Sequence, residues 1–108
     1  MSVVAAFTYV VKSDAIGKNV ALLEEYKAWV KKRQDLFKSL KSYQIFMKFS
    51  GGKFGEFVEM MEFGNLADLQ TCYDAVMKDK EYLSIYFPPM VDMIIPGTFG
   101  MEIWNPVP

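Results

Sequence analysis

The chain contains no histidine and only one cysteine, Cys72. Histidine is the commonest general base near neutral pH and the commonest metal ligand, so its absence argues against a metal centre. A lone cysteine cannot form an internal disulfide, and nothing else in the sequence indicates an oxidising compartment. Without a histidine to activate it, Cys72 is better explained by packing than by nucleophilic catalysis. We therefore expect no metal site and no cysteine nucleophile.

Neither an excess of positive charge nor a long hydrophobic run is present. The 12 lysines and arginines are balanced by 13 aspartates and glutamates, which is not the electrostatic footprint of a nucleic-acid binder. The apolar stretch at residues 1–12 is too short to span a membrane and has no basic lead-in for a signal peptide. Gly51-Gly52 lacks the following helix and the Lys-Ser/Thr pair of a phosphate-binding loop. We expect a cytoplasmic protein that binds neither nucleic acid nor a membrane.

Apolar and aromatic side chains are abundant, at 52% and 16% of the 108 residues. This composition predicts one globular domain over residues 1–108 with a well-filled core. The clearest local pattern is a β-hairpin at residues 43–63, where side chains alternate along both arms. Gly51 and Gly52 lie between the arms and tolerate the positive φ angles of a chain reversal.

Both faces of this hairpin carry large apolar groups. The second arm places Val58 and Met60 on one face, and Phe57, Glu59, Met61 and Phe63 on the other. A sheet with one face in water shows a cleaner alternation of apolar and polar residues. We infer that helices cover one face and a second subunit the other, although the pattern does not say which is which.

The segments around the hairpin complete a βαββαβ order. A strand is predicted at residues 3–12, followed by a helix from an N-cap at Asn19 to about Leu40. After the hairpin, Asn65 with Asp68 three residues later predicts the start of a second helix. This helix is expected to bury a stripe made of Leu66, Leu69, Tyr73, Val76 and Met77.

The last third of the chain is expected to be broken into short pieces. Residues 78–80 predict a break, and residues 81–86 resume helical character. Pro88-Pro89 is expected to end that piece, because proline has no amide hydrogen and clashes in a helix interior. A further short helical turn is allowed at residues 90–95, and residues 98–104 alternate again as the final strand.

With right-handed connections, this order gives an α+β fold of the ferredoxin-like type. One antiparallel four-stranded sheet would carry both helices on one face. Its other face is more apolar than a solvent-exposed surface, so we expect a homodimer formed through it, with a higher oligomer left open.

Two short stretches, residues 69–74 (LQTCYD) and 79–82 (DKEY), resemble the second-helix region of the dimeric α/β-barrel superfamily. This superfamily includes the antibiotic-biosynthesis-monooxygenase-like, EthD-like and NIPSNAP-like groups. The resemblance covers nearly the whole chain in architecture and implies a dimeric α/β barrel. Members include cofactor-independent monooxygenases, isomerases and haem-degrading enzymes. Haem-binding members typically ligate iron through histidine, so the resemblance implies no cofactor here.

Arg33 and Glu59 are the charged residues that interrupt apolar patterns. Arg33 falls within the apolar stripe of the first helix. Its guanidinium can reach water or a carboxylate such as Glu59, or it can anchor an anionic ligand between helix and sheet. Glu59 lies on an apolar strand face, where it is paired, exposed at an edge, or shifted upward in pKa by desolvation. In the last case it is a candidate general acid or base.

Aromatic residues could line a pocket for a planar substrate, although such spacings are also those of a core. The residues considered are Tyr9, Trp29, Tyr43, Tyr86 and Trp104. Monooxygenase-like members of the superfamily use tryptophan and tyrosine with asparagine in such a pocket, and no asparagine of this chain can be placed in the cleft from the sequence. Our predicted ligand-binding set is Tyr9, Trp29, Arg33, Glu59 and Tyr86.

Two functions are compatible with these patterns, and a third, RNA binding, is disfavoured. The first is binding of a small hydrophobic or aromatic molecule by a dimeric α/β barrel, with chemistry of the monooxygenase or isomerase type. The second is a non-catalytic dimeric module for assembly or partner binding. RNA-recognition motifs share the element order, but Phe54 and Phe57 are three residues apart and face opposite ways in a regular strand, which disfavours RNA.

Overall fold

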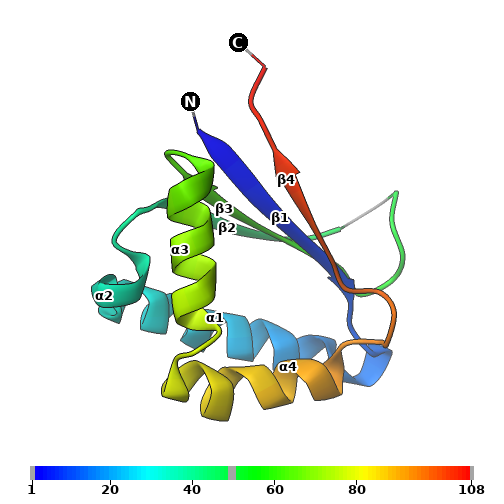
Figure 1. Ribbon diagram of the computed structural model, residues 1–108. Helices are drawn as coiled ribbons and strands as arrows, with labels where there is room; N and C mark the ends of the chain where they lie inside the picture. The colour runs from blue at the N-terminus through cyan, green and yellow to red at the C-terminus, as the bar shows by residue number, and fades with distance from the viewer. Residues whose placement is uncertain (1, 49–50, 108) are drawn as a thin grey trace.

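A computed structural model, which describes residues 2–48 and 51–107, has the expected α+β ferredoxin-like architecture (Figure 1). Its main elements are β1 (Val3–Val10), α1 (Ile16–Lys32), β2 (Leu40–Met47), β3 (Glu56–Phe63), α3 (Leu66–Val76) and β4 (Gly100–Trp104). Short helical pieces connect them: η1 (Ser13–Ala15), α2 (Gln34–Phe37), η2 (Tyr82–Tyr86) and α4 (Phe87–Met93). Phe49 and Ser50, expected at the end of the first hairpin strand, lie outside the described residues.

The four strands form an antiparallel sheet in the order β2-β3-β1-β4 (Figure 1). Residues directly opposite each other in such a sheet share a face. Phe7 pairs with Glu59 and Tyr9 pairs with Phe57, and these side chains face the helices. The pattern predicted for β3 is therefore correct, and its helix-facing set is the one that contains Glu59. Val58 and Met60 face the opposite side, which no other element of the described chain covers.

The first helix differs from the sequence expectation at both ends. Helix α1 begins at Ile16, so Asn19 is not the N-cap but a buried residue of the first turn. The helix ends at Lys32, because Arg33 has φ −101° and ψ 60°, outside helical geometry. The short helix α2 and strand β2 follow, and the prediction of a helix to Leu40 is therefore wrong.

The start of α3 is as predicted. The Asn65 side chain accepts a hydrogen bond from the backbone N–H of Asp68 at 2.8 Å, which satisfies one of the free donors at the helix N-terminus. The buried stripe consists of Leu69, Cys72 and Val76, so Cys72 does serve in packing. Leu66 and Tyr73 are instead exposed, because the side of α3 turned toward the sheet is the one that carries Cys72.

Pro88-Pro89 does not end the helical segment, contrary to the prediction. Helix α4 follows η2 directly, and its prolines lie in its first turn. The preceding segment η2 is a π-helix that closes with a hydrogen bond from the Phe87 N–H to the Tyr82 carbonyl, so the prolines lie at the start of a new α-helical segment. Proline is tolerated there because the amide hydrogens of a first turn have no partner within their own helix. The resulting helical run from Tyr82 to Met93 faces the sheet across the site described next. Within the described residues, no helix is both long and apolar enough to cross a membrane.

Candidate functional site

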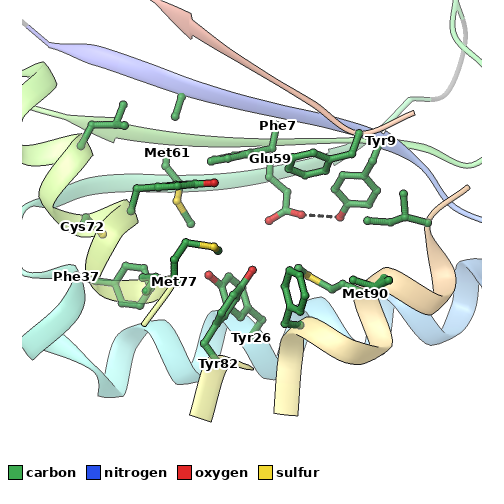
Figure 2. A pocket seen from close by; sticks show the side chains of 18 of the residues that line it. Phe7, Tyr9, Tyr26, Phe37, Glu59, Met61, Cys72, Met77, Tyr82 and Met90 are labelled. Carbon is green, nitrogen blue, oxygen red and sulfur yellow. Dashed lines mark hydrogen bonds between the residues drawn. The ribbon is translucent and has the colours of Figure 1, made fainter. Parts of the chain in front are cut away.

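A cavity of about 460 Å³ lies between the helix-facing side of the sheet and the helices α1, α3 and α4 (Figure 2). Most of its lining side chains are apolar or aromatic, among them Phe7, Phe37, Met61, Met77 and Met90. The lining residues with polar side chains are Glu59, Cys72 and four tyrosines, Tyr9, Tyr26, Tyr73 and Tyr82. An apolar cavity of this size with few polar groups is typical of small-molecule sites.

Glu59 is held in place by two tyrosines from the neighbouring strands. The Tyr9 hydroxyl on β1 donates a hydrogen bond to Oε2 of Glu59 at 2.5 Å, and the Tyr43 hydroxyl on β2 donates one to Oε1. In the register of the sheet, Phe7 and Ile45 lie directly opposite Glu59. The two tyrosines are diagonal neighbours, within the reach of long side chains. The alternation of the strands thus brings all three groups to one face.

Burial dominates the acid–base properties of this cluster. Only 8% of Glu59 is exposed. Desolvation raises the pKa of its carboxyl, and the hydrogen bonds from Tyr43 and Tyr9 offset part of that rise by favouring the charged form. Burial and the charge of Glu59 also raise the pKa of Tyr9 and of Tyr43, so both hydroxyls stay protonated near neutral pH.

Asn19 is a member of this neighbourhood that the sequence did not reveal. It is almost fully buried, and its Nδ2 has no hydrogen-bond partner among the described residues. Its side chain lies close enough to the Tyr9 hydroxyl to offset part of the rise in the pKa of Tyr9. Its position in the first turn of α1, rather than at a cap, is what brings it there. The sequence could have predicted this position of Asn19 only if the start of α1 at Ile16 had been recognised.

The raised pKa of Glu59 predicts a specific dependence of stability on pH. A carboxyl whose pKa is higher in the folded state binds protons more tightly there, so its contribution to stability is complete below about pH 4.5, its unperturbed pKa, and is lost as pH rises through the folded pKa. We expect the melting temperature of the native protein to rise relative to that of Glu59→Gln as pH falls from 8 to 5. Each unit of pKa shift corresponds to about 1.4 kcal/mol.

Comparing the two proteins at each pH removes the contributions of the other carboxylates. Asp35, Asp79 and Glu56 have lowered pKa values because of Arg33 and Lys48, and they act in the opposite direction at lower pH in both proteins. A constant difference in melting temperature across the range, or one that changes in the opposite sense, would contradict the prediction.

Arg33 lies at the protein surface, away from the cavity and from Glu59. Its guanidinium pairs with Asp79 at 2.7 Å, Glu81 at 2.7 Å and Asp35 at 3.0 Å. It also lies 5.3 Å from the centre of the Trp29 ring. The helix ends one residue earlier, which directs this side chain to the start of the η2 segment. Arg33 therefore meets carboxylates, as one of the two alternatives predicts, but these three take the place of Glu59. Arg33 does not line the cavity between helix and sheet.

The other predicted residues divide between cavity and core. Tyr9 and Glu59 line the cavity. Trp29 and Tyr86 do not, because they pack on each other in the core with ring centres 5.1 Å apart. Tyr26 and Tyr82 line the cavity instead and lie opposite Glu59 (Figure 2). Helical periodicity marks Tyr26 as buried, but it cannot show that the side chain meets a cavity.

No cluster of three metal-ligating side chains of the His, Cys, Asp or Glu type occurs in the part of the chain that the structure describes. Among the described residues that line the cavity, there is also no lysine or arginine. The polar groups of the lining residues can form hydrogen bonds and exchange protons, and the remaining side chains provide apolar contacts.

No protein-family model and no curated protein matches this sequence. Several solved structures do match the fold. A NIPSNAP family protein from Agrobacterium tumefaciens has a TM-score of 0.78 at 15% identity, over 99% of this chain and 94% of that one. A NIPSNAP family protein of unknown function from the same organism has a TM-score of 0.75 at 23% identity, over 97% and 87%. An antibiotic biosynthesis monooxygenase has a TM-score of 0.65 at 19% identity, over the full length of both chains.

The fold is thus the ferredoxin-like one found in NIPSNAP family proteins and in an antibiotic biosynthesis monooxygenase, as the resemblance in the sequence predicts. At these identities the likeness establishes the fold and not the reaction, because one fold hosts many functions.

Proposed function

We propose that this protein is a homodimeric small-molecule-binding protein whose cavity takes a hydrophobic or aromatic molecule. Glu59 accepts a proton from that molecule and returns it, the step used by cofactor-independent enzymes of the isomerase type. The observation that carries the proposal is the buried Glu59 carboxylate on the wall of an otherwise apolar cavity of about 460 Å³. A carboxyl with a raised pKa in a cavity is typical of general acids and bases.

The position of Glu59 supports this role. Figure 2 shows its carboxylate projecting from the sheet toward the open interior of the cavity, beside the Tyr9 hydroxyl. Hydrogen bonds from two tyrosines fix its orientation, which a proton-transfer group needs. The antibiotic biosynthesis monooxygenase of the same fold favours an enzymatic role by analogy.

The face of the sheet away from the helices supports the homodimer. Alternation places Val4, Ala6, Phe46, Val58, Met60 and Trp104 on this face. Phe46 and Trp104 are exposed in the single chain. The polar side chains of Glu62, Glu102, Ser42 and Gln44 share this face with them. An exposed sheet face that combines large apolar side chains with polar ones is suited to an interaction surface, and a two-fold dimer would cover it with a second copy.

We expect N-phenyl-1-naphthylamine, a neutral fluorescent aromatic amine, to bind in the cavity. The test variant is Val91→Trp, because Val91 lines the cavity from α4 and is exposed at its rim. A tryptophan there narrows the entrance, and we expect affinity to fall by roughly tenfold or more. Fluorescence titration measures both proteins.

The matched control is Val20→Trp. Val20 is exposed on α1 and does not line the cavity, so this variant should bind as the native protein does. Equal affinity for all three proteins would contradict binding in this cavity. Absence of binding by the native protein would favour the alternative function, a non-catalytic dimeric module.

A further inference from the structure

The charge of the cavity is opposite to what an anion-binding site requires. Among the described residues that line it, Glu59 is the sole carboxylate, and no lysine or arginine is present. Arg33, which the sequence places in the ligand-binding set, is instead paired with three carboxylates at the protein surface. An anionic ligand would therefore meet the Glu59 carboxylate with no compensating cation, in surroundings where charges are weakly screened.

Glu59 also retains unused capacity to accept hydrogen bonds. A carboxylate has about four acceptor positions, two on each oxygen. Tyr9 and Tyr43 each occupy one, on different oxygens. Since the residue is 8% exposed, bulk water has little access to the remaining positions, and a donor group on a ligand in the cavity would fill one of them.

The opposite wall of the cavity is suited to the body of the same ligand. Tyr26 and Tyr82 face Glu59 across the cavity with their rings among apolar side chains (Figure 2). No hydrogen bond from either hydroxyl to another described residue is present, so these groups remain free for a second polar atom of the ligand. The rings of Tyr26 and Tyr82 lie 6.1 Å apart at their centres and provide faces that favour aromatic or cationic groups.

We propose that the cavity selects aromatic molecules that present a hydrogen-bond donor, a hydroxyl or an ammonium group, to Glu59, and that it rejects molecules whose polar group is a carboxylate. This inference rests on the proposed function, since it requires a ligand in the cavity. In addition to the proposed function, the ligand has a hydrogen-bond donor, and Glu59 is the residue that binds it.

A series of four ligands with one ring system tests the proposal. Isothermal titration calorimetry at mildly alkaline pH would compare 2-naphthol, 2-naphthylmethylamine, 2-naphthoate and naphthalene, which share the same apolar surface. We expect naphthol or naphthylmethylamine to bind roughly tenfold more tightly than naphthalene, the range of a hydrogen bond to a charged group. Naphthoate should bind more weakly than naphthalene. Whether naphthol or the amine binds more tightly identifies the donor as neutral or cationic.

The variant Glu59→Gln shows whether the charge of the carboxylate, rather than the shape of the cavity, determines which ligands bind. This variant removes the charge at nearly constant size, and we expect the ratio of affinities for amine and naphthoate to fall at least tenfold. Glu24→Gln, on the exposed surface of α1, should leave the ratio unchanged. Should Glu59→Gln fail to fold, Tyr43→Phe frees one further acceptor position on Glu59 and should increase the preference for donors.

Two results would overturn the inference while leaving intact the proposed binding of a hydrophobic or aromatic molecule in the cavity. One is naphthoate binding as tightly as naphthol in the native protein. The other is a ratio of affinities that does not change in Glu59→Gln, or that moves toward naphthoate in Tyr43→Phe. Failure of all four compounds to bind the native protein would instead overturn the inference and the proposed function together.

Discussion

Replacing Phe57 by alanine is expected to lower the free energy of unfolding by about 3–5 kcal/mol, the range for removing a buried phenylalanine ring from a core. Phe57 is 2% exposed and stacks on Tyr9 with ring centres 5.8 Å apart. It packs in a cluster with Val11, Leu23 and Met93. The loss has two parts, the transfer of the ring into water and the empty space left behind, because strands and helix can close that space only in part.

The control is the same substitution three residues earlier. Phe54 lies in the connection between β2 and β3 and is 78% exposed, so Phe54→Ala should change the free energy of unfolding by less than about 0.5 kcal/mol. Urea denaturation at one fixed protein concentration measures both variants, since a dimer would make the midpoint depend on concentration. Equal effects of the two substitutions would show that the interior is packed differently.

Met60→Lys is expected to dissociate the proposed homodimer. Met60 lies on the central strand β3, on the face away from the helices, opposite Ala6 and Gln44. Two copies of a lysine would be buried in a two-fold interface, and burial of an unpaired ion is unfavourable by several kcal/mol. We expect the dissociation constant to rise at least roughly a thousandfold, equivalent to about 4 kcal/mol. Analytical ultracentrifugation over a range of concentrations measures it.

Met47→Lys provides the matched control on the same sheet. Met47 pairs with Phe57 and therefore faces the opposite side, where it is exposed near the end of β2. Its replacement should leave the dimer intact while both variants remain folded by circular dichroism. A native protein that sediments as a monomer at all concentrations, or a Met60→Lys protein that remains a dimer, would contradict dimerisation through this face.

The parts of the fold that the sequence predicts are those that local chemistry decides. Alternation along β3 separates Glu59 from Met60, whichever face the helices cover, because side chains in a strand must point to opposite sides. The N-cap at Asn65 can be predicted from the sequence because its side chain accepts a hydrogen bond from the backbone N–H of Asp68, only three residues later. The element order then limits the topology to a small number of folds.

The parts that the sequence does not predict depend on contacts between distant segments. Arg33 interrupts α1 where its side chain reaches Asp79 and Glu81, which are 46 and 48 residues away in the chain. Tyr82 meets the cavity because η2 and α4 form one run across Pro88-Pro89. The periodicity of apolar residues in the sequence indicates which side chains are buried, but it does not indicate whether they fill a core or surround a cavity. For this reason the sequence predicts Trp29 and Tyr86 in the site, although they belong to the core.

The strand order places β2 and β4 at the two edges of the sheet, where backbone groups are free to pair with a strand from another molecule. Short edge strands, lysine and proline are the features by which natural sheets resist such pairing. β4 has five residues and is followed by Pro106, and β2 carries Lys41 with Lys48 just beyond its end. These features disfavour strand addition at both edges of the sheet, which lowers the tendency of the chain to form extended, amyloid-like aggregates.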